Sequence, residues 1–115
     1  MGVIPERLGG HMERLRIEYE TGYMELNIAV FFPCPIQKAR KIAKLINRYC
    51  SDETRAELLS TLCELADGYA ALCGEHKRKM SELSEDSSGY CYWRAQFNRT
   101  ETLRKRMERN IRLIQ

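Results

Sequence analysis

The sequence predicts an α+β fold, in which an N-terminal β-hairpin packs on helices and a long antiparallel helical hairpin forms the rest. In residues 14–32, apolar and polar side chains alternate with the period of two that half-buried strands require. From Leu59 to Leu83, apolar-leaning positions recur at intervals of three and four, a period that a helix alone keeps on one face. A polar loop at 84–89 then follows, and the chain most simply returns as a second helix.

Size and composition favour one folded domain over 1–115. The chain is 43% hydrophobic and 30% charged, which suits a modest core and differs from a disordered chain. No apolar run approaches the roughly 20 residues that span a bilayer, so we expect no membrane partner. Residues 1–11 contain Pro5 and three glycines, and two interpretations stay open for them: a flexible tail, or an alternative start of the chain before Met12. Five widely spaced cysteines are typical of reduced thiols, which predicts a cytoplasmic protein.

The predicted hairpin covers 14–32. Its first strand places Leu15 and Ile17 on one face, and Thr21-Gly22 is the predicted turn because glycine adopts the positive φ of tight connections. The alternation continues to Phe32, so the second strand is predicted to end there, before the first proline of Pro-Cys-Pro. Since an isolated hairpin is marginal in water, its apolar face needs a helix across it.

A basic helix is predicted over 36–49, and the preceding proline suits its first turn. Its apolar positions, which we expect to be buried, are Ile36, Ala39, Ile42, Ala43, Ile46 and Tyr49. Its charged positions are all basic and comprise Lys38, Arg40, Lys41, Lys44 and Arg48.

A long helix is predicted over 52–83, capped by Ser51 or Asp52. Gly68 and Gly74 are interpreted as a slight bend or a close crossing by another element. The apolar stripe becomes thinner and more polar beyond Gly68, so we expect the distal half to project as an arm. A flanking row at seven-residue intervals comprises Leu58, Leu65 and Leu72.

The last segment, 90–114, has two interpretations. As one helix it carries a stripe that could pair with the long helix in a coiled-coil-like seam: Trp93, Phe97, Thr100, Leu103, Met107, Ile111 and Ile114. Alternation over 90–97 would instead make a third strand, followed by a shorter helix from Asn98. The continuous helix is favoured because a short loop after a long helix most simply returns a second one.

The net charge of +3 conceals a segregation along the chain. Residues 36–50 sum to +5, 51–86 to −5 and 87–115 to +5. Acidic and basic helices often lie against each other with their charges matched at the seam, and we expect that arrangement here.

No motif for a reaction is present, so the sequence predicts no enzyme activity, no cofactor and no metal site. Zinc sites usually draw four ligands from close pairs, and the chain has no C-x-x-C pair. Cys73 and His76 share a helical face but are interpreted as a core residue and a seam residue. Cys34, between two prolines, is the best candidate for a reactive thiol and is interpreted as a buried corner.

The leading hypothesis is a small non-enzymatic protein-binding module that acts as an inhibitor, adaptor or regulator of a protein or ribonucleoprotein. Proteins of this size without catalytic motifs include phage and mobile-element inhibitors such as anti-CRISPR proteins. The predicted partner-binding residues are Tyr90, Tyr92 and Trp93, since aromatic side chains are enriched in interfaces. The competing interpretation of this cluster is a plug that closes the end of the helical hairpin.

The alternative hypothesis is nucleic-acid binding through the basic helices 36–49 and 99–112, since lysine and arginine rows track phosphates. Its predicted residues are Lys38, Lys41, Lys44, Arg104, Lys105, Arg106 and Arg109. The competing interpretation is a basic face that is solvated or matched by the acidic helix. Self-association through the long seam is a third hypothesis.

Overall fold

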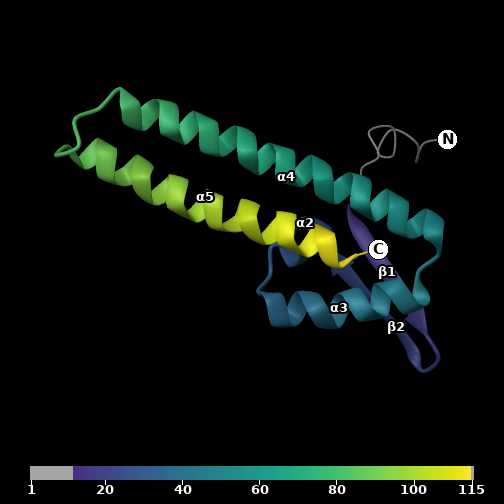
Figure 1. The fold of residues 1–115 in the computed structure, drawn as a ribbon. Helices are drawn as coiled ribbons and strands as arrows, with labels where there is room; N and C mark the ends of the chain where they lie inside the picture. Colours follow the sequence, from purple (N-terminus) through teal and green to yellow (C-terminus); the bar gives the residue numbers. More distant parts are fainter. Residues whose placement is uncertain (1–11, 115) are drawn as a thin grey trace.

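A computed structural model describes residues 12–114, so the tail predicted at 1–11 lies outside the described residues. The elements are β1 (Arg14–Tyr19), β2 (Gly22–Asn27), α2 (Ile28–Phe31), α3 (Ile36–Tyr49), α4 (Asp52–Ser81) and α5 (Ser88–Leu113). Figure 1 shows the hairpin and α3 gathered at one end of two long antiparallel helices, α4 and α5. The predicted α+β class is therefore confirmed.

The hairpin pairs β1 with β2 in an antiparallel register that runs from Arg14 opposite Asn27 to Tyr19 opposite Gly22. The two connecting residues are 20 and 21, so the turn lies one residue before the predicted one. Gly22 begins β2 with a φ of 155°, a conformation that side chains with a Cβ rarely adopt. Glycine is therefore needed here, at the start of the second strand.

The prediction that the second strand extends to Phe32 is wrong. The strand ends at Asn27, whose Oδ1 accepts a hydrogen bond from the Val30 N–H at 3.2 Å and caps the helical turn α2. The Phe32 N–H then donates to the Ile28 carbonyl at 3.0 Å. A turn of helix places residues four apart on one side, which is why Ile28 and Phe32 are both 1% exposed.

The three longer helices keep close to their predicted ranges. α3 has the predicted bounds, whereas α4 ends two residues early and α5 begins two residues early. Ser51 Oγ accepts from the Thr54 N–H at 3.1 Å, and Ser87 Oγ accepts from the Tyr90 N–H at 3.1 Å, so serines cap α4 and α5. The close crossing expected at the glycines of α4 is wrong, because in the described chain a Cβ at Gly68 would meet no atom within 4 Å.

α5 is one continuous helix, which confirms the favoured interpretation of the last segment. The alternative, a third strand at 90–97, is wrong. The alternation there is shared by a helical stripe that places Trp93 and Thr100 on the side facing α4, where they are half-buried and buried.

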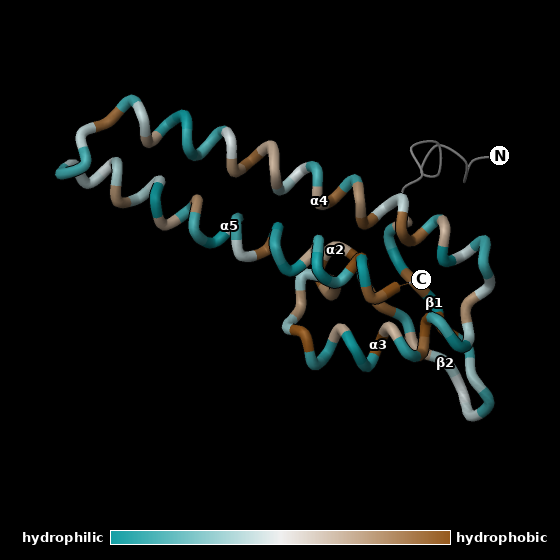
Figure 2. The backbone as a smooth tube through the Cα atoms, viewed as in Figure 1, coloured by the Kyte–Doolittle hydropathy of each residue, from teal (hydrophilic) through white to brown (hydrophobic). Residues whose placement is uncertain are grey.

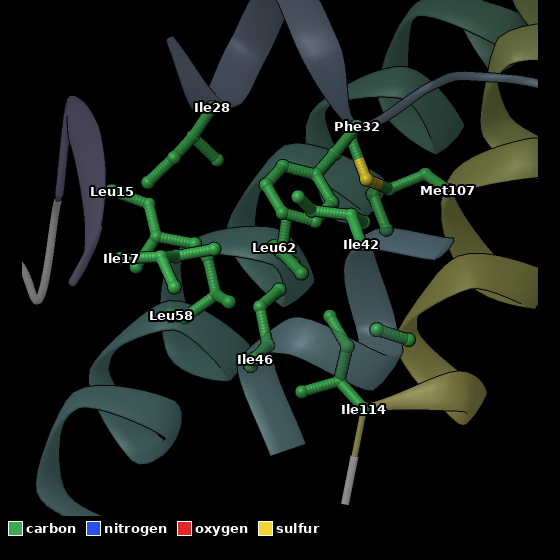
Figure 3. Close-up of a cluster of buried hydrophobic side chains, with 12 residues drawn as sticks. Leu15, Ile17, Ile28, Phe32, Ile42, Ile46, Leu58, Leu62, Met107 and Ile114 are labelled. Carbon is green, nitrogen blue, oxygen red and sulfur yellow. The ribbon is translucent and has the colours of Figure 1, made fainter. Parts of the chain in front are cut away.

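The hydrophobic core lies at the end of the helical pair where all six elements meet, and this end is called the base below. Figure 3 shows side chains of β1, α2, α3 and α4 packed together with Phe32, with Met107 of α5 and with Ile114, which follows α5. Figure 2 shows the hydrophobic residues gathered there, whereas the far ends of α4 and α5 are more hydrophilic. Within the described residues, Cys73 and Thr100 are the buried residues of the paired helices beyond Ala66 and before Met107. The part of the helical pair that follows Ala66 in α4 and precedes Thr100 in α5, together with the connecting loop 82–87, is called the arm below.

A buried amide fastens α5 to the segment between α2 and α3. Asn110 is 1% exposed, and its Nδ2 donates to the carbonyl oxygen of Phe32 and, at 3.2 Å, to that of Cys34. Arg109 Nη2 donates to the same Cys34 carbonyl at 2.8 Å and to Asn110 Oδ1 at 3.0 Å. Both ends of the buried amide are therefore hydrogen-bonded, as burial of a polar group requires.

The expected matching of charges across the seam is wrong for the described residues. In α4 and α5, the ion pairs between described residues lie within one helix: Arg78 bonds Glu75 and Glu82 along α4, and Arg104 bonds Glu108 along α5 at 3.0 Å. The seam is built instead from apolar and polar side chains, among them the buried Cys73. Among the described residues, no ion pair joins α3 to α4 either.

Replacing Asn110 with alanine should lower the free energy of unfolding by about 2–4 kcal/mol, because two buried carbonyls lose their donor and a cavity forms. Chemical denaturation followed by circular dichroism measures this change. Asn98→Ala, at an exposed position of the same helix, is the matched control and should change stability by less than about 0.5 kcal/mol. Equal effects of the two substitutions would contradict a structural role for the amide.

Candidate functional site

The three predicted partner-binding aromatics lie at the start of α5, near the end of the arm, where Tyr92 packs against Trp93 but lies outside the hollow that Tyr90 lines. Residues at 90 and 93 lie toward α4, whereas the intervening Tyr92 points away because successive residues of a helix are rotated by about 100°. Tyr90 lines a shallow hollow of about 330 Å³ with Met80 and Leu83. Tyr92 is 57% exposed, and Trp93 is half-buried.

Trp93 is held on several sides. Its ring lies 5.6 Å from that of His76 and 5.0 Å from that of Tyr92, which meets it edge-on at 82°. The Lys79 ammonium lies 5.0 Å from the Trp93 ring centroid, within the range of a cation–π contact. Trp93 therefore has the contacts of a residue that closes the seam, while Tyr92 leans against it and remains accessible.

The seam beneath this cluster contains one unpaired polar atom. His76 Nδ1 is buried and, among the described residues, has no hydrogen-bond partner. A buried polar atom without a partner costs about 1–3 kcal/mol. The arm is consequently held less strongly than the base, where the buried amide of Asn110 is fully bonded.

Exposed large apolar side chains are concentrated on the arm. Five are recorded in the described chain, and the three on the arm are Leu72 (48% exposed), Leu83 (38%) and Tyr92. The other two, Tyr23 and Val30, lie on β2 and α2. Leu83 lies in the loop that joins α4 and α5, and Tyr92 lies near the start of α5.

The first predicted basic row is accessible. Lys38, Lys41 and Lys44 are exposed on α3, and none of them forms an ion pair with another described residue. Burial of the opposite face of α3, through Ile42 and Ile46, fixes which way the lysines point. Their charges are therefore left to solvent or to a ligand.

The residues of the second predicted basic row differ in whether an acidic side chain matches their charge. Arg104 is neutralised by Glu108 at 3.0 Å and by Glu101 at 3.6 Å, so its charge is matched within α5. Arg109 uses its donors on the Cys34 carbonyl and on Asn110, but both acceptors are neutral and its charge persists. Lys105 is exposed and Arg106 partly so.

The two rows meet at the Pro33–Cys34–Pro35 corner. Burial raises the pKa of the Cys34 thiol, and the positive charges of Arg109, Lys38 and Arg106 partly oppose that rise. These cations come from α3 and α5, while the acidic Glu25 of β2 lines a hollow together with Cys34 and Lys38. The group of Lys38, Arg106 and Arg109 is called the cationic corner below.

Burial also raises the pKa of the Cys50 thiol, so Cys34 and Cys50 lack the lowered pKa that a reactive cysteine needs. Cys34 and Cys73 are buried, and all five cysteines are free. In residues 12–114, no three histidine, cysteine, aspartate or glutamate side chains form a group that could hold a metal ion.

Sequence reasoning did not find the roles of Arg109 and Asn110 in the base. The available sign was the position of Asn110, which follows Leu103 by seven residues and Met107 by three and so falls on the apolar face of α5. A polar residue at such a position is buried and needs partners, but its partners lie 76 and 78 residues away. Their identity could not be deduced from local pattern.

Comparison with known protein families, curated proteins and solved structures returns no match to this chain. Within residues 12–114, no helix is both long enough and apolar enough to cross a membrane. The function is therefore argued from the arm and the cationic corner themselves.

Proposed function

We propose that the chain is a non-enzymatic binding protein that docks on another protein through the end of its arm and acts as an inhibitor, adaptor or regulator. The observation that carries the proposal is the exposure of Tyr92 and Leu83 at the end of the arm, away from the core. Tyrosine and tryptophan supply much of the binding energy in protein interfaces.

The support beneath Tyr92 favours this use. Because Trp93 is fixed by His76 and Lys79, the tyrosine ring rests edge-on against a held surface at 5.0 Å. A side chain that is already positioned loses less conformational entropy on binding than a free one. The base does not need this residue, since Tyr92 is no member of the hydrophobic core or of the side chains packed against it.

Tyr92→Ala should abolish or weaken partner binding at least tenfold while leaving the melting temperature unchanged, because the ring is mostly exposed. The measurement is affinity capture from the native cell with quantitative mass spectrometry, followed by titration of the captured protein. Tyr23→Ala, which removes an equally exposed tyrosine (55%) from β2, is the matched control and should bind normally. A partner retained equally by both variants would contradict docking through the arm end.

A second candidate function is nucleic-acid binding, which the cationic corner favours. Lys38 belongs to both the corner and the α3 row, so the row of Lys41 and Lys44 continues the same positive surface. Lysine side chains without acidic partners release counterions when they meet phosphates, and this release drives sequence-independent binding.

Lys41→Gln with Lys44→Gln should weaken binding to random-sequence DNA or RNA and reduce the slope of log K against log salt by roughly 1–2. Fluorescence anisotropy over a salt series measures both quantities. Lys77→Gln with Arg94→Gln removes the same charge from the arm and should leave the slope unchanged. Absence of binding by the unmodified protein at low salt would reject this candidate function.

A further inference from the structure

β2 is an edge strand whose apolar side chains are incompletely covered. Within the described residues the sheet has two strands, so β2 pairs on one side alone, with β1. Leu15 and Ile17 of β1 are 1% exposed, whereas Leu26 and Met24, which lie opposite them on β2, are half-buried. The apolar face of the hairpin therefore has room for a further strand on the β2 side.

The pairing leaves alternate backbone groups of β2 pointing away from β1. The Ile28 N–H donates to the Glu13 carbonyl at 3.0 Å, which fixes which residues of β2 face their partner strand. Because backbone groups alternate in direction along a strand, those of Tyr23 and Glu25 point outward. Both residues are exposed, so another extended chain can reach their N–H and C=O groups.

An apolar hollow of about 360 Å³ lies where this edge meets α2 and the Pro33–Cys34–Pro35 corner. Leu26, Val30 and Phe31 are among the residues that line it. Val30 is 78% exposed, more than any other large apolar side chain recorded as exposed in the described chain. A side chain of an added strand can therefore bury apolar surface here.

The side of the hollow formed by α3 is positively charged. Lys38 lines it, is exposed and forms no ion pair with another described residue. The two arginines of the cationic corner partly oppose the rise in the pKa of the Cys34 thiol, which also lines the hollow. The carboxylate of Glu25 lies 4.0 Å from Arg16 of β1, which partly matches its charge. An acidic side chain is therefore favoured beside Lys38.

Together these features fit an extended peptide better than a nucleic acid. Phosphates would use the cations but neither the strand edge nor the apolar hollow, whereas an extended peptide uses all three. When a peptide adds to the edge of a sheet, backbone hydrogen bonds supply affinity and pockets for alternate side chains supply specificity.

We infer that the outer edge of β2 binds an extended acidic segment of a partner protein as a third strand. An apolar side chain of that segment occupies the hollow, and a carboxylate lies beside Lys38. This goes beyond the proposed function, because β2 lies in the base, at the other end of the molecule from Tyr92 and Leu83 (Figure 1).

Selection of random heptapeptides displayed on phage against the unmodified protein tests the inference. The enriched peptides should alternate apolar residues and carry aspartate or glutamate toward one end. The most enriched peptide is then synthesised with a fluorescent label, and its dissociation constant is measured by fluorescence anisotropy.

Two substitutions of one edge residue test the backbone contact. Glu25→Pro should raise the peptide dissociation constant roughly tenfold or more, because it removes an outward N–H that the hairpin does not use. Glu25→Ala removes the same carboxylate but keeps the N–H, so it is the matched control and should still bind. Circular dichroism checks that both variants are folded.

Two charge reversals on α3 test the acidic end of the peptide. Lys38→Glu should raise the dissociation constant roughly tenfold, because it places like charges together. Lys44→Glu makes the same charge change at an exposed position that is not among those lining the hollow, and it should leave the constant unchanged.

Amide hydrogen exchange locates the bound peptide on the protein. Binding should slow exchange at Tyr23 and Glu25, whose N–H groups point outward. Exchange at Met24 and Leu26 should change less, because their N–H groups already bond to β1.

Absence of any enriched peptide would overturn the inference, as would enriched peptides without acidic residues. Equal binding by Glu25→Pro and Glu25→Ala would show that the strand edge is not used. A dimer in sedimentation equilibrium that Glu25→Pro dissociates would assign the edge to a second copy of the chain and overturn the peptide as its occupant. Tyr92→Ala should leave peptide binding unchanged, so failure of the arm-end proposal and failure of this one are distinguishable.

Discussion

The buried amide of Asn110 is the interaction on which the arrangement of the molecule depends. It joins the carboxyl end of α5 to the carbonyls of Phe32 and Cys34, and so connects the last helix to the segment between α2 and α3. Arg109 reinforces the junction at 2.8 Å, and Asn47 Nδ2 of α3 donates to the Leu113 carbonyl at 3.2 Å. With that end of α5 fixed, the start of α5 and the end of α4 extend away from the core.

This division explains why side chains of the helical pair are more fully buried near the base than along the arm. Near the base, Leu58, Leu62 and Met107 are fully buried between several elements. Along the arm, two helices alone cover the seam, and His76 leaves a buried nitrogen without a partner in the described structure. An exposed aromatic side chain at the end of such an arm adds nothing to the core, which is why a binding role is the more economical interpretation of Tyr92.

The local residue pattern was sufficient to predict most of the fold. It was insufficient for the parts whose structure depends on contacts between residues far apart in the sequence. The helical periods of α3, α4 and α5 and the alternation of β1 come from residues that are neighbours in sequence, so they could be read directly. The second strand was predicted to be too long because Ile28 and Phe32 fit both the period of a strand and that of a helical turn. The role of Asn27 as a helix cap was not predicted. The cationic corner required knowing that α5 ends beside α3, a proximity that no local pattern contains.

We expect the base, which is fastened through Asn110, to be the stable unit and the arm to open independently of it. Native-state amide hydrogen exchange along α5 can check this expectation, because it measures an opening free energy for each residue. Amides near Met107 should exchange only with global unfolding, whereas those from 93 to 97 should exchange through local opening at lower free energy. The same opening free energy along the whole helix would contradict it.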